Sequence, residues 1–321
     1  MTKLAKVLFV SFLFSLPTRL SAFELKHSEG IVKLAAPPQI IVSYDLAVLD
    51  SLHYLQIPVA GMPDVRQREP FQKYGEMPSV GSLFEPDYDA LNSLKPDLIF
   101  ASRRTQDKLS KLNQVAPAAY LSTAPGQFLS DFKSHHLHLA KAFSKEAEVE
   151  PKLAAIEEDL TKLHQLNQGR TAALLMVFND RKIISQGAGD VMAYAFEVLG
   201  LSVVPTAKPE PAAQAKAHQA HSPKKRKQGA AENAYRRHQQ QLQAIAEANP
   251  DWLLVMDRQQ MRTGKLQADA IIQAHPVLGN MDAVVYKRVL YLDPARWYLM
   301  RGGLDNLHQL ITTTSQAMQG D

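Results

Sequence analysis

The chain has 321 residues, a formal charge of +4 and no cysteine. That length is too great for one ordinary core and predicts two domains. The lack of cysteine excludes disulfides, thiolate metal sites and a lipid-modified N-terminal cysteine. The positive charge is local, because residues 206–241 hold eight basic residues against two acidic ones. The sequence therefore predicts a mildly acidic globular protein with one basic insert.

The first 22 residues are typical of a secretory signal peptide. Lys3 and Lys6 precede an apolar run over residues 7–16, and small residues follow up to Ala22. The run is too short to span a bilayer. We predict cleavage after about Ala22, which would leave the mature protein in an exported compartment, most simply the periplasm.

Between residues 31 and 125, short apolar strands alternate with helical stretches. The periodicity predicts strands over 39–43, 59–62 and 98–101, and helices over 45–55, 87–94 and 108–115. Asp45 is expected to cap the first of these helices. Such alternation predicts a mainly parallel sheet with helices on both faces.

Residues 127–167 contain no glycine and predict two helices. The first covers 128–143 and carries His135, His136 and His138, which are expected to be solvated. The second has Pro151 in its first turn and an apolar face, and its length makes it a candidate connector. We predict an N-terminal lobe over 23–143, a connecting helix over 144–168 and a C-terminal lobe over 169–321.

The second half repeats the same pattern. Strands are predicted over 172–178, 252–256 and 289–292, and helices over 191–199, 242–248, 268–273 and 304–318. Both halves contain a helix, a Pro-Asp turn and a buried strand in that order, at 94–99 and 248–253. Residues 206–237 have few branched apolar side chains and predict a mobile loop.

The segment 291–304 is the one most suggestive of a ligand site. Trp297 and Tyr298 lie between Arg296 and Arg301, just after a strand. Guanidinium groups suit anionic, oxygen-rich ligands, and a deprotonated phenol can coordinate a hard metal. The structural alternative is a strand end with the tryptophan packed in the core.

Several motifs together resemble periplasmic iron–siderophore binding proteins of ABC importers, in the class III periplasmic binding family and its catecholate-type branch. They are Val80-Gly81-Ser82-Leu83-Phe84-Glu85-Pro86-Asp87-Tyr88, Leu94-Lys95-Pro96-Asp97-Leu98-Ile99, Asn249-Pro250-Asp251-Trp252-Leu253, Met256-Asp257-Arg258 and the segment 291–304. The resemblance implies an α/β fold of two Rossmann-like lobes joined by a single long helix, with the ligand cleft between them.

The same resemblance implies a binding protein and no enzyme. Its cargo would be a ferric siderophore, its partner an inner-membrane ABC permease, and it would hold no permanently bound cofactor. A monomer that binds no nucleic acid is expected. Haem, cobalamin or another metal chelate remains open as the ligand, as does a divergent receptor without iron binding. No common catalytic motif is present.

The resemblance also implies that three arginines and a tyrosine surround the iron complex. It places the first arginine at Arg104, beside Arg103, the third at Arg258 and the iron-coordinating tyrosine at Tyr298. The second arginine is missing, because its turn here reads Gly189-Asp190-Val191-Met192.

Arg236 and Arg237 of the basic insert, and His238 directly after it, are candidates to replace what is missing. Each could supply the positive charge or a ligand, and His238 lies near the position of a family histidine that can coordinate iron. Trp297 and Arg301 are further candidates for ligand contact. For docking on the permease, the resemblance points to Glu85 and Asp89 on the first lobe. On the second lobe the corresponding residues are Gln243 and Glu247.

Overall fold

The computed structural model describes residues 22–65, 69–204 and 223–319, with backbone alone for 223–231 and 262. The predicted signal peptide lies outside the described residues, except for Ala22. Within these ranges, no helix is both long and apolar enough to cross a membrane.

The first half of the chain forms a small parallel sheet with a hairpin beside it. Its strands run in the order β3 (Ile41–Ser43), β4 (Leu98–Ala101) and β5 (Ala118–Tyr120). The hairpin pairs β1 (Phe23–His27) with β2 (Gly30–Leu34). The short helices of this half are α1 (Leu46–Tyr54), α2 (Tyr88–Leu94) and α3 (Leu109–Leu112). The carboxylate of Asp45 accepts hydrogen bonds from Ala47 N and Val48 N, so the expected cap of α1 is confirmed.

The second half forms a larger sheet in the order β10-β9-β6-β7, with β8 also paired to β6. Its strands are β6 (Thr171–Asn179), β7 (Lys182–Gln186), β8 (Ser202–Val203), β9 (Trp252–Asp257) and β10 (Val289–Tyr291). The β6–β7 pair is antiparallel, and the other pairs are parallel. Strand β9 is buried throughout, as its continuous apolar sequence predicts. The helices here are α6 (Tyr194–Leu199), α7 (Pro223–Ala248), α8 (Gln260–Thr263), α9 (Ala268–Ala274) and α10 (Asp282–Val285).

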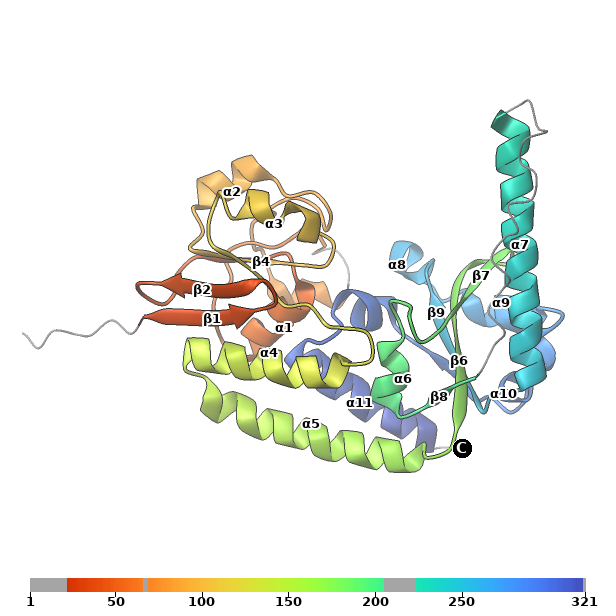
Figure 1. The fold of residues 1–321 in the computed structure, drawn as a ribbon. Helices are drawn as coiled ribbons and strands as arrows, with labels where there is room; N and C mark the ends of the chain where they lie inside the picture. The colour runs from red at the N-terminus through yellow and green to blue at the C-terminus, as the bar shows by residue number, and fades with distance from the viewer. Residues whose placement is uncertain (1–21, 66–68, 205–222, 320–321) are drawn as a thin grey trace, which may run out of the picture.

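Three long helices lie along one side of both sheets (Figure 1). They are α4 (Phe128–Phe143), α5 (Glu146–Leu166) and α11 (Leu304–Gln319). Their apolar faces contribute to one buried cluster that includes Phe128 and Phe132 of α4 as well as Trp252 of β9. The two halves therefore share a continuous core. The domain boundaries at residues 143 and 168 stay predictions.

Three local predictions were wrong. Residues 59–62 form only isolated bridges, between Val42 and Gly61 and between Met62 and Ser79. The helix expected over 108–115 is reduced to a 3-10 turn and α3. Pro151 lies inside α5, which begins at Glu146, so its missing N–H removes one hydrogen bond of the helix.

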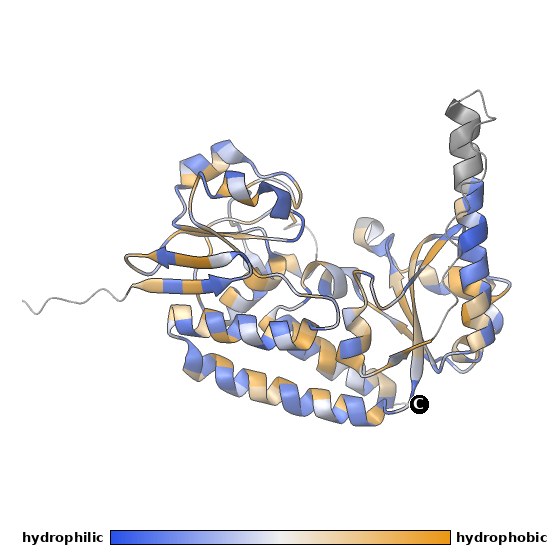
Figure 2. Ribbon diagram, in the orientation of Figure 1, coloured by the Kyte–Doolittle hydropathy of each residue, from blue (hydrophilic) through white to orange (hydrophobic). Residues whose placement is uncertain are grey.

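The basic insert gives the largest correction, although residues 206–222 of the predicted loop lie outside the described residues. From Pro223 onward it is helical and continuous with the predicted helix at 242–248. Lysine, arginine, glutamine and alanine favour helix even where they bury little surface, and Leu242 and Ile245 anchor the far end of α7 in the core. Most of the described length of α7 is hydrophilic (Figure 2). Low apolar content was therefore a poor reason to exclude a helix.

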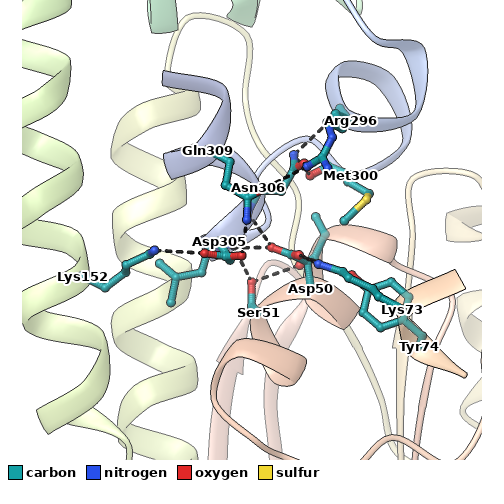
Figure 3. Close-up of polar contacts among 12 residues, drawn as sticks. Asp50, Ser51, Lys73, Tyr74, Lys152, Arg296, Met300, Asp305, Asn306 and Gln309 are labelled. Atoms are coloured by element: carbon teal, nitrogen blue, oxygen red, sulfur yellow. Dashed lines mark hydrogen bonds and ion pairs between the residues drawn. The ribbon is translucent and has the colours of Figure 1, made fainter. Parts of the chain in front are cut away.

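A buried aspartate on α1 caps the start of α11 (Figure 3). Asp50 Oδ2 accepts hydrogen bonds from Asp305 N at 3.1 Å and Asn306 N at 2.8 Å. Ser51 Oγ accepts from Leu304 N at 3.0 Å. The close approach requires Gly303, where a Cβ would lie 2.6 Å from Asp50 Oδ2. These bonds satisfy N–H groups that the first turn of a helix leaves unpaired.

Two residues of the first half complete the surroundings of this carboxylate. Lys73 Nζ lies 2.9 Å and the Tyr74 hydroxyl 3.3 Å from Asp50 Oδ1. The Asp50 side chain is wholly buried, whereas that of Lys73 is 35% exposed. The burial of the charge is thus compensated by four donors from two segments, residues 73–74 and the start of α11.

Replacing Asp50 by Ala should lower the free energy of unfolding by about 3–5 kcal/mol, because it leaves buried donors without a partner. Urea denaturation measures the change. Asp159→Ala is a matched control, since Asp159 forms partly exposed pairs with Lys162 and His308, and should cost no more than about 1 kcal/mol. Equal losses in the two variants would contradict a special role for Asp50.

Candidate ligand site between the two lobes

Arg104 and Arg258 lie on loops at the carboxyl ends of strands β4 and β9. After β4, Ser102 Oγ accepts from Arg104 N at 3.2 Å, and Thr105 Oγ1 accepts from Ser102 N at 3.0 Å. After β9, the buried carboxylate of Asp257 accepts from four backbone N–H groups, those of Gln259, Gln260, Gln267 and Ala268. Both loops are therefore held by short side-chain bonds, as expected for the ligand-binding edge of a parallel sheet.

Guanidinium groups from the two halves both lie close to the ring of Tyr298. Tyr298 belongs to a π-helical turn, Ala295–Leu299. The Cζ atoms of Arg104 and Arg258 lie 5.2 and 4.4 Å from the ring centroid, within the range of cation–π attraction. Arg104 Nη2 also donates to the Tyr298 carbonyl at 3.3 Å. The structure thus brings together the three residues that the resemblance implied.

A cavity of about 90 Å³ opens beside this stack, lined by residues of both lobes. Arg103, Arg104 and Arg301 line it, together with the Asp45 carboxylate, and Arg103 is the exposed member. Burial lowers the pKa of Arg104, and the charges of Arg103 and Arg301 lower it further, against the opposite effect of Tyr298 and Asp45. The cavity is smaller than the roughly 300–1,000 Å³ of most small-molecule sites, so a larger ligand requires side chains or lobes to move.

Asp45 combines a structural bond with a position in this cavity. Burial raises the pKa of its carboxyl, while the N–H groups of Val48 and Ala47 and the charges of Arg104 and Arg301 act in the opposite direction. Because its Oδ1 atom already caps α1, Asp45 neutralises the nearby arginines only in part.

Histidines on α4 form the inner wall, which corrects the expectation that they are solvated. His136 is 3% exposed and lies 2.8 Å, through Nε2, from Ser51 Oγ. Its Nδ1 lies 2.7 Å from the Phe132 carbonyl, so this nitrogen is the N–H donor. His135 is half-buried and also lines the cavity. The error arose because the apolar stripe of α4 continues through His136, a residue type that the periodicity treats as polar.

Trp297 belongs to the core and not to the cavity wall. It is 3% exposed and packs near Tyr194, with ring centroids 6.0 Å apart. The hydroxyl of Tyr194 donates to the Trp297 carbonyl. The structural alternative for Trp297 is therefore confirmed, and the expectation of direct ligand contact was wrong. Tyr298 is partly buried against the same core cluster that contains Trp297.

Arg236 and His238 lie on α7, outside the residues that line the cavity. The side chain of Arg236 is 69% exposed, and its nearest acid is Glu232, 4.0 Å away on the same helix. Burial lowers the pKa of His238, and the charges of Arg237 and Lys182 lower it further. Both residues belong to α7, which runs along the outer side of the second lobe (Figure 1). The structure therefore does not support either residue as a replacement cation or iron ligand.

The residues implied for permease docking are all exposed. Glu85 pairs with Lys108 at 3.3 Å, and Asp89 lies in the first turn of α2. On the second lobe, Gln243 Nε2 donates to Glu247 Oε1 at 3.0 Å on the last turns of α7. Gln243 and Glu247 also line an open groove.

Three residues that line the cavity were not predicted from the sequence: Ser122, Thr123 and Val191. The first two follow β5, so the rule that ligands bind outside the carboxyl ends of parallel strands could have found them. No comparable sequence rule predicts Val191, because this residue lies in the turn before α6 and not directly after a parallel strand.

Comparison with known proteins places this geometry in a family. Residues 41–295 match the family model described as periplasmic binding protein. The chain therefore belongs to this family, and its two-lobed α/β fold is that of the class III members, as predicted.

Individual relatives cover nearly the whole chain. The petrobactin-binding protein YclQ of Bacillus subtilis is 27% identical over 312 residues, 94% of this chain and 90% of that protein. Its crystal structure matches with a TM-score of 0.73 over 93% of this chain and 99% of the solved chain. The ferric-anguibactin-binding protein FatB of Vibrio anguillarum is 24% identical over 89% of this chain and 84% of that protein. The catecholate-siderophore binding protein VctP of Vibrio cholerae shares the fold, with 23% identity and a TM-score of 0.74 over 94% of this chain and 100% of that chain.

Protonation of His136 should destabilise the folded protein in acid. Burial lowers the pKa of this imidazole to about 4, below the value of about 6.5 in an unfolded chain. Between these values the unfolded state binds more protons, so stability falls as the pH falls. The expected contribution is about 2 kcal/mol between pH 7 and pH 5.

Urea denaturation of wild type and His136→Gln at the two pH values measures this effect. The variant should lose about 2 kcal/mol less than wild type on acidification, whatever its stability at pH 7. His53→Gln, at an exposed position of α1, should retain the wild-type difference. A variant that follows the wild-type slope would rule out His136 as the source.

Proposed function

We propose that this protein captures a ferric siderophore in the periplasm and delivers it to an ABC importer of the inner membrane. The observation that carries the proposal is the pair of guanidinium groups, one from each lobe, that lie within 5.2 Å of the centroid of the Tyr298 ring. The names of the relatives YclQ and FatB, which bind petrobactin and ferric anguibactin, support it.

The chemistry of the stack suits a chelate with aromatic, anionic donors. A ferric catecholate is negatively charged and presents planar aromatic rings, and its oxygens accept charge-assisted hydrogen bonds from arginine. Arg104 and Arg258 already lie against an aromatic ring, and a catechol ring offers a similar surface. Partial burial strengthens these interactions relative to water. We therefore favour a catecholate-type ligand.

The iron reaches the protein as cargo, with most of its ligands supplied by the chelator. In the described ranges, no group of three or more histidine, aspartate or glutamate side chains could hold a metal ion. Tyr298 would complete the coordination of a chelate that leaves one position open, and binding to the metal would drive its deprotonation. The protein holds no permanent cofactor, acts as a monomer and catalyses no reaction.

The permease would contact the exposed acids of both lobes. Glu85 and Asp89 would serve the first lobe, and Gln243 with Glu247 the second. Because glutamine stands at one of these positions, the second lobe would present less negative charge to the permease than the first.

Titration of residues 23–321 with ferric siderophores tests the proposal directly. Trp297 is buried next to Tyr298, so an iron chelate at the site should quench tryptophan fluorescence. Ferric catecholate, hydroxamate and carboxylate siderophores, haem and cobalamin form the panel. Binding of haem or cobalamin alone would replace the proposed function, and no binding by any ferric chelate would refute it.

Arg104→Gln and Arg258→Gln should each weaken binding of the best ferric siderophore by about 10- to 100-fold, because each removes a charge-assisted hydrogen bond. Fluorescence titration gives the dissociation constants. Arg236→Gln removes an equal charge from the exposed face of α7 and should change affinity less than about threefold. A similar loss in all three variants would indicate only long-range attraction.

Tyr298→Phe should abolish the phenolate-to-iron charge-transfer band in complexes with chelates that leave one coordination position open. The substitution keeps the ring that Arg104 and Arg258 contact but removes the only oxygen of the side chain. Visible absorption spectra of the loaded proteins measure the band. An unchanged spectrum would remove Tyr298 from the coordination sphere, although its stacking role would remain.

A further inference from the structure

Arg301 bridges the two lobes beside the stack of Arg104, Tyr298 and Arg258. Its Nη1 donates to the Val191 carbonyl of the second lobe at 2.9 Å. Its Nη2 donates to Thr123 Oγ1 of the first lobe at 3.2 Å. Both acceptors are uncharged, and the Cζ atom lies 5.5 Å from the Tyr194 ring. Arg301 forms no ion pair with any residue that the structure describes.

The charges around this side chain are unbalanced. Arg103, Arg104 and Arg301 line the cavity, and Asp45 is the one carboxylate among its described lining residues. Both hydrogen bonds that the Asp45 carboxylate accepts come from backbone N–H groups at the start of α1. Two like charges close to Arg104 are unfavourable unless an anion lies among them. The cavity therefore has an unmet requirement for negative charge.

The surroundings of Arg301 differ in chemistry from those of Tyr298. At Tyr298 the arginines lie against an aromatic face, whereas near Arg301 the cavity is lined by the hydroxyl residues Ser122 and Thr123. A guanidinium has five N–H donors in one plane, of which two are used here. A planar fork of this kind matches a carboxylate, which accepts two parallel bonds.

We propose that Arg301, Ser122 and Thr123 form a subsite for a free carboxylate on the chelator. The protein then selects ferric chelates that combine aromatic donors at Tyr298 with a carboxylate at Arg301. This inference rests on the proposed function and narrows its ligand class. Arg301 acts as a selectivity residue, since the cation is held in place by both lobes before the ligand arrives.

The test uses ferric complexes of two synthetic bis-catecholate chelators that differ only in a backbone carboxylate or its primary amide. Fluorescence titration gives the affinity of each complex for wild type, Arg301→Gln, Arg301→Lys and Arg296→Gln. Arg296 is the matched control, because it lies five residues before Arg301 in the same segment, 291–304, but bonds to Gln309 and Asn306 outside the cavity (Figure 3). Thermal unfolding confirms that each variant is folded.

Wild type should prefer the carboxylate complex by about 10- to 100-fold, the usual effect of a bidentate charged contact. Arg301→Gln should remove this preference and leave affinity for the amide complex within about threefold. Arg301→Lys should retain only part of the preference, because lysine keeps the charge and lacks the fork. Arg296→Gln should behave as wild type.

Three results would overturn the inference. If wild type binds both complexes equally, the proposed function stands and the carboxylate subsite is rejected. If Arg301→Gln weakens both complexes equally, Arg301 supplies general attraction and no selectivity. If wild type binds neither complex and no other ferric siderophore, the proposed function fails as well.

Discussion

The capping of α11 by Asp50 and Ser51 is the constraint on which the rest of the structure depends. The bonds join a helix of the first lobe to backbone N–H groups at residues 304–306 of the second. The segment that leads into α11 carries both Tyr298 and Arg301. The capping bonds that connect the two lobes therefore also help to position Tyr298 and Arg301. Asn306 adds to this by donating to the carbonyls of Arg296 and Met300.

The site itself concentrates positive charge at the seam between the two lobes. Arg104 stays in place through its contacts with Tyr298, and Arg258 has Met261 Sδ at 3.4 Å as a further neighbour. Neither arrangement neutralises the charge. Clustered cations of this kind are unfavourable for stability, and the proposed anionic ligand would offset that cost on binding. The buried carboxylate of Asp257 is compensated differently, because four backbone N–H groups surround it.

Much of this architecture could be predicted from the sequence, and the failures have identifiable causes. Alternating apolar strands and helices, with Pro-Asp turns in both halves, predicted the two α/β lobes. The resemblance placed Arg104, Arg258 and Tyr298, which the structure brings together. The role of Asp50 could not be predicted, because a lone aspartate on an apolar helix face has no partner within its own segment. Arg236 and His238 were misplaced because sequence spacing cannot show that α7 extends unbroken to Pro223.

The length of α7 affects how the proposed permease could bind this protein. At 1.5 Å per residue, a helix of 26 residues is roughly 39 Å long, and only its C-terminal end is seated in the core. Gln243 and Glu247 lie at this C-terminal end, so they belong to the same continuous helix as the basic residues that follow Pro223 in the sequence. If the proposed permease contacts these two residues, its surface needs an open space for the N-terminal part of α7. A flat permease surface at that position would collide with the helix.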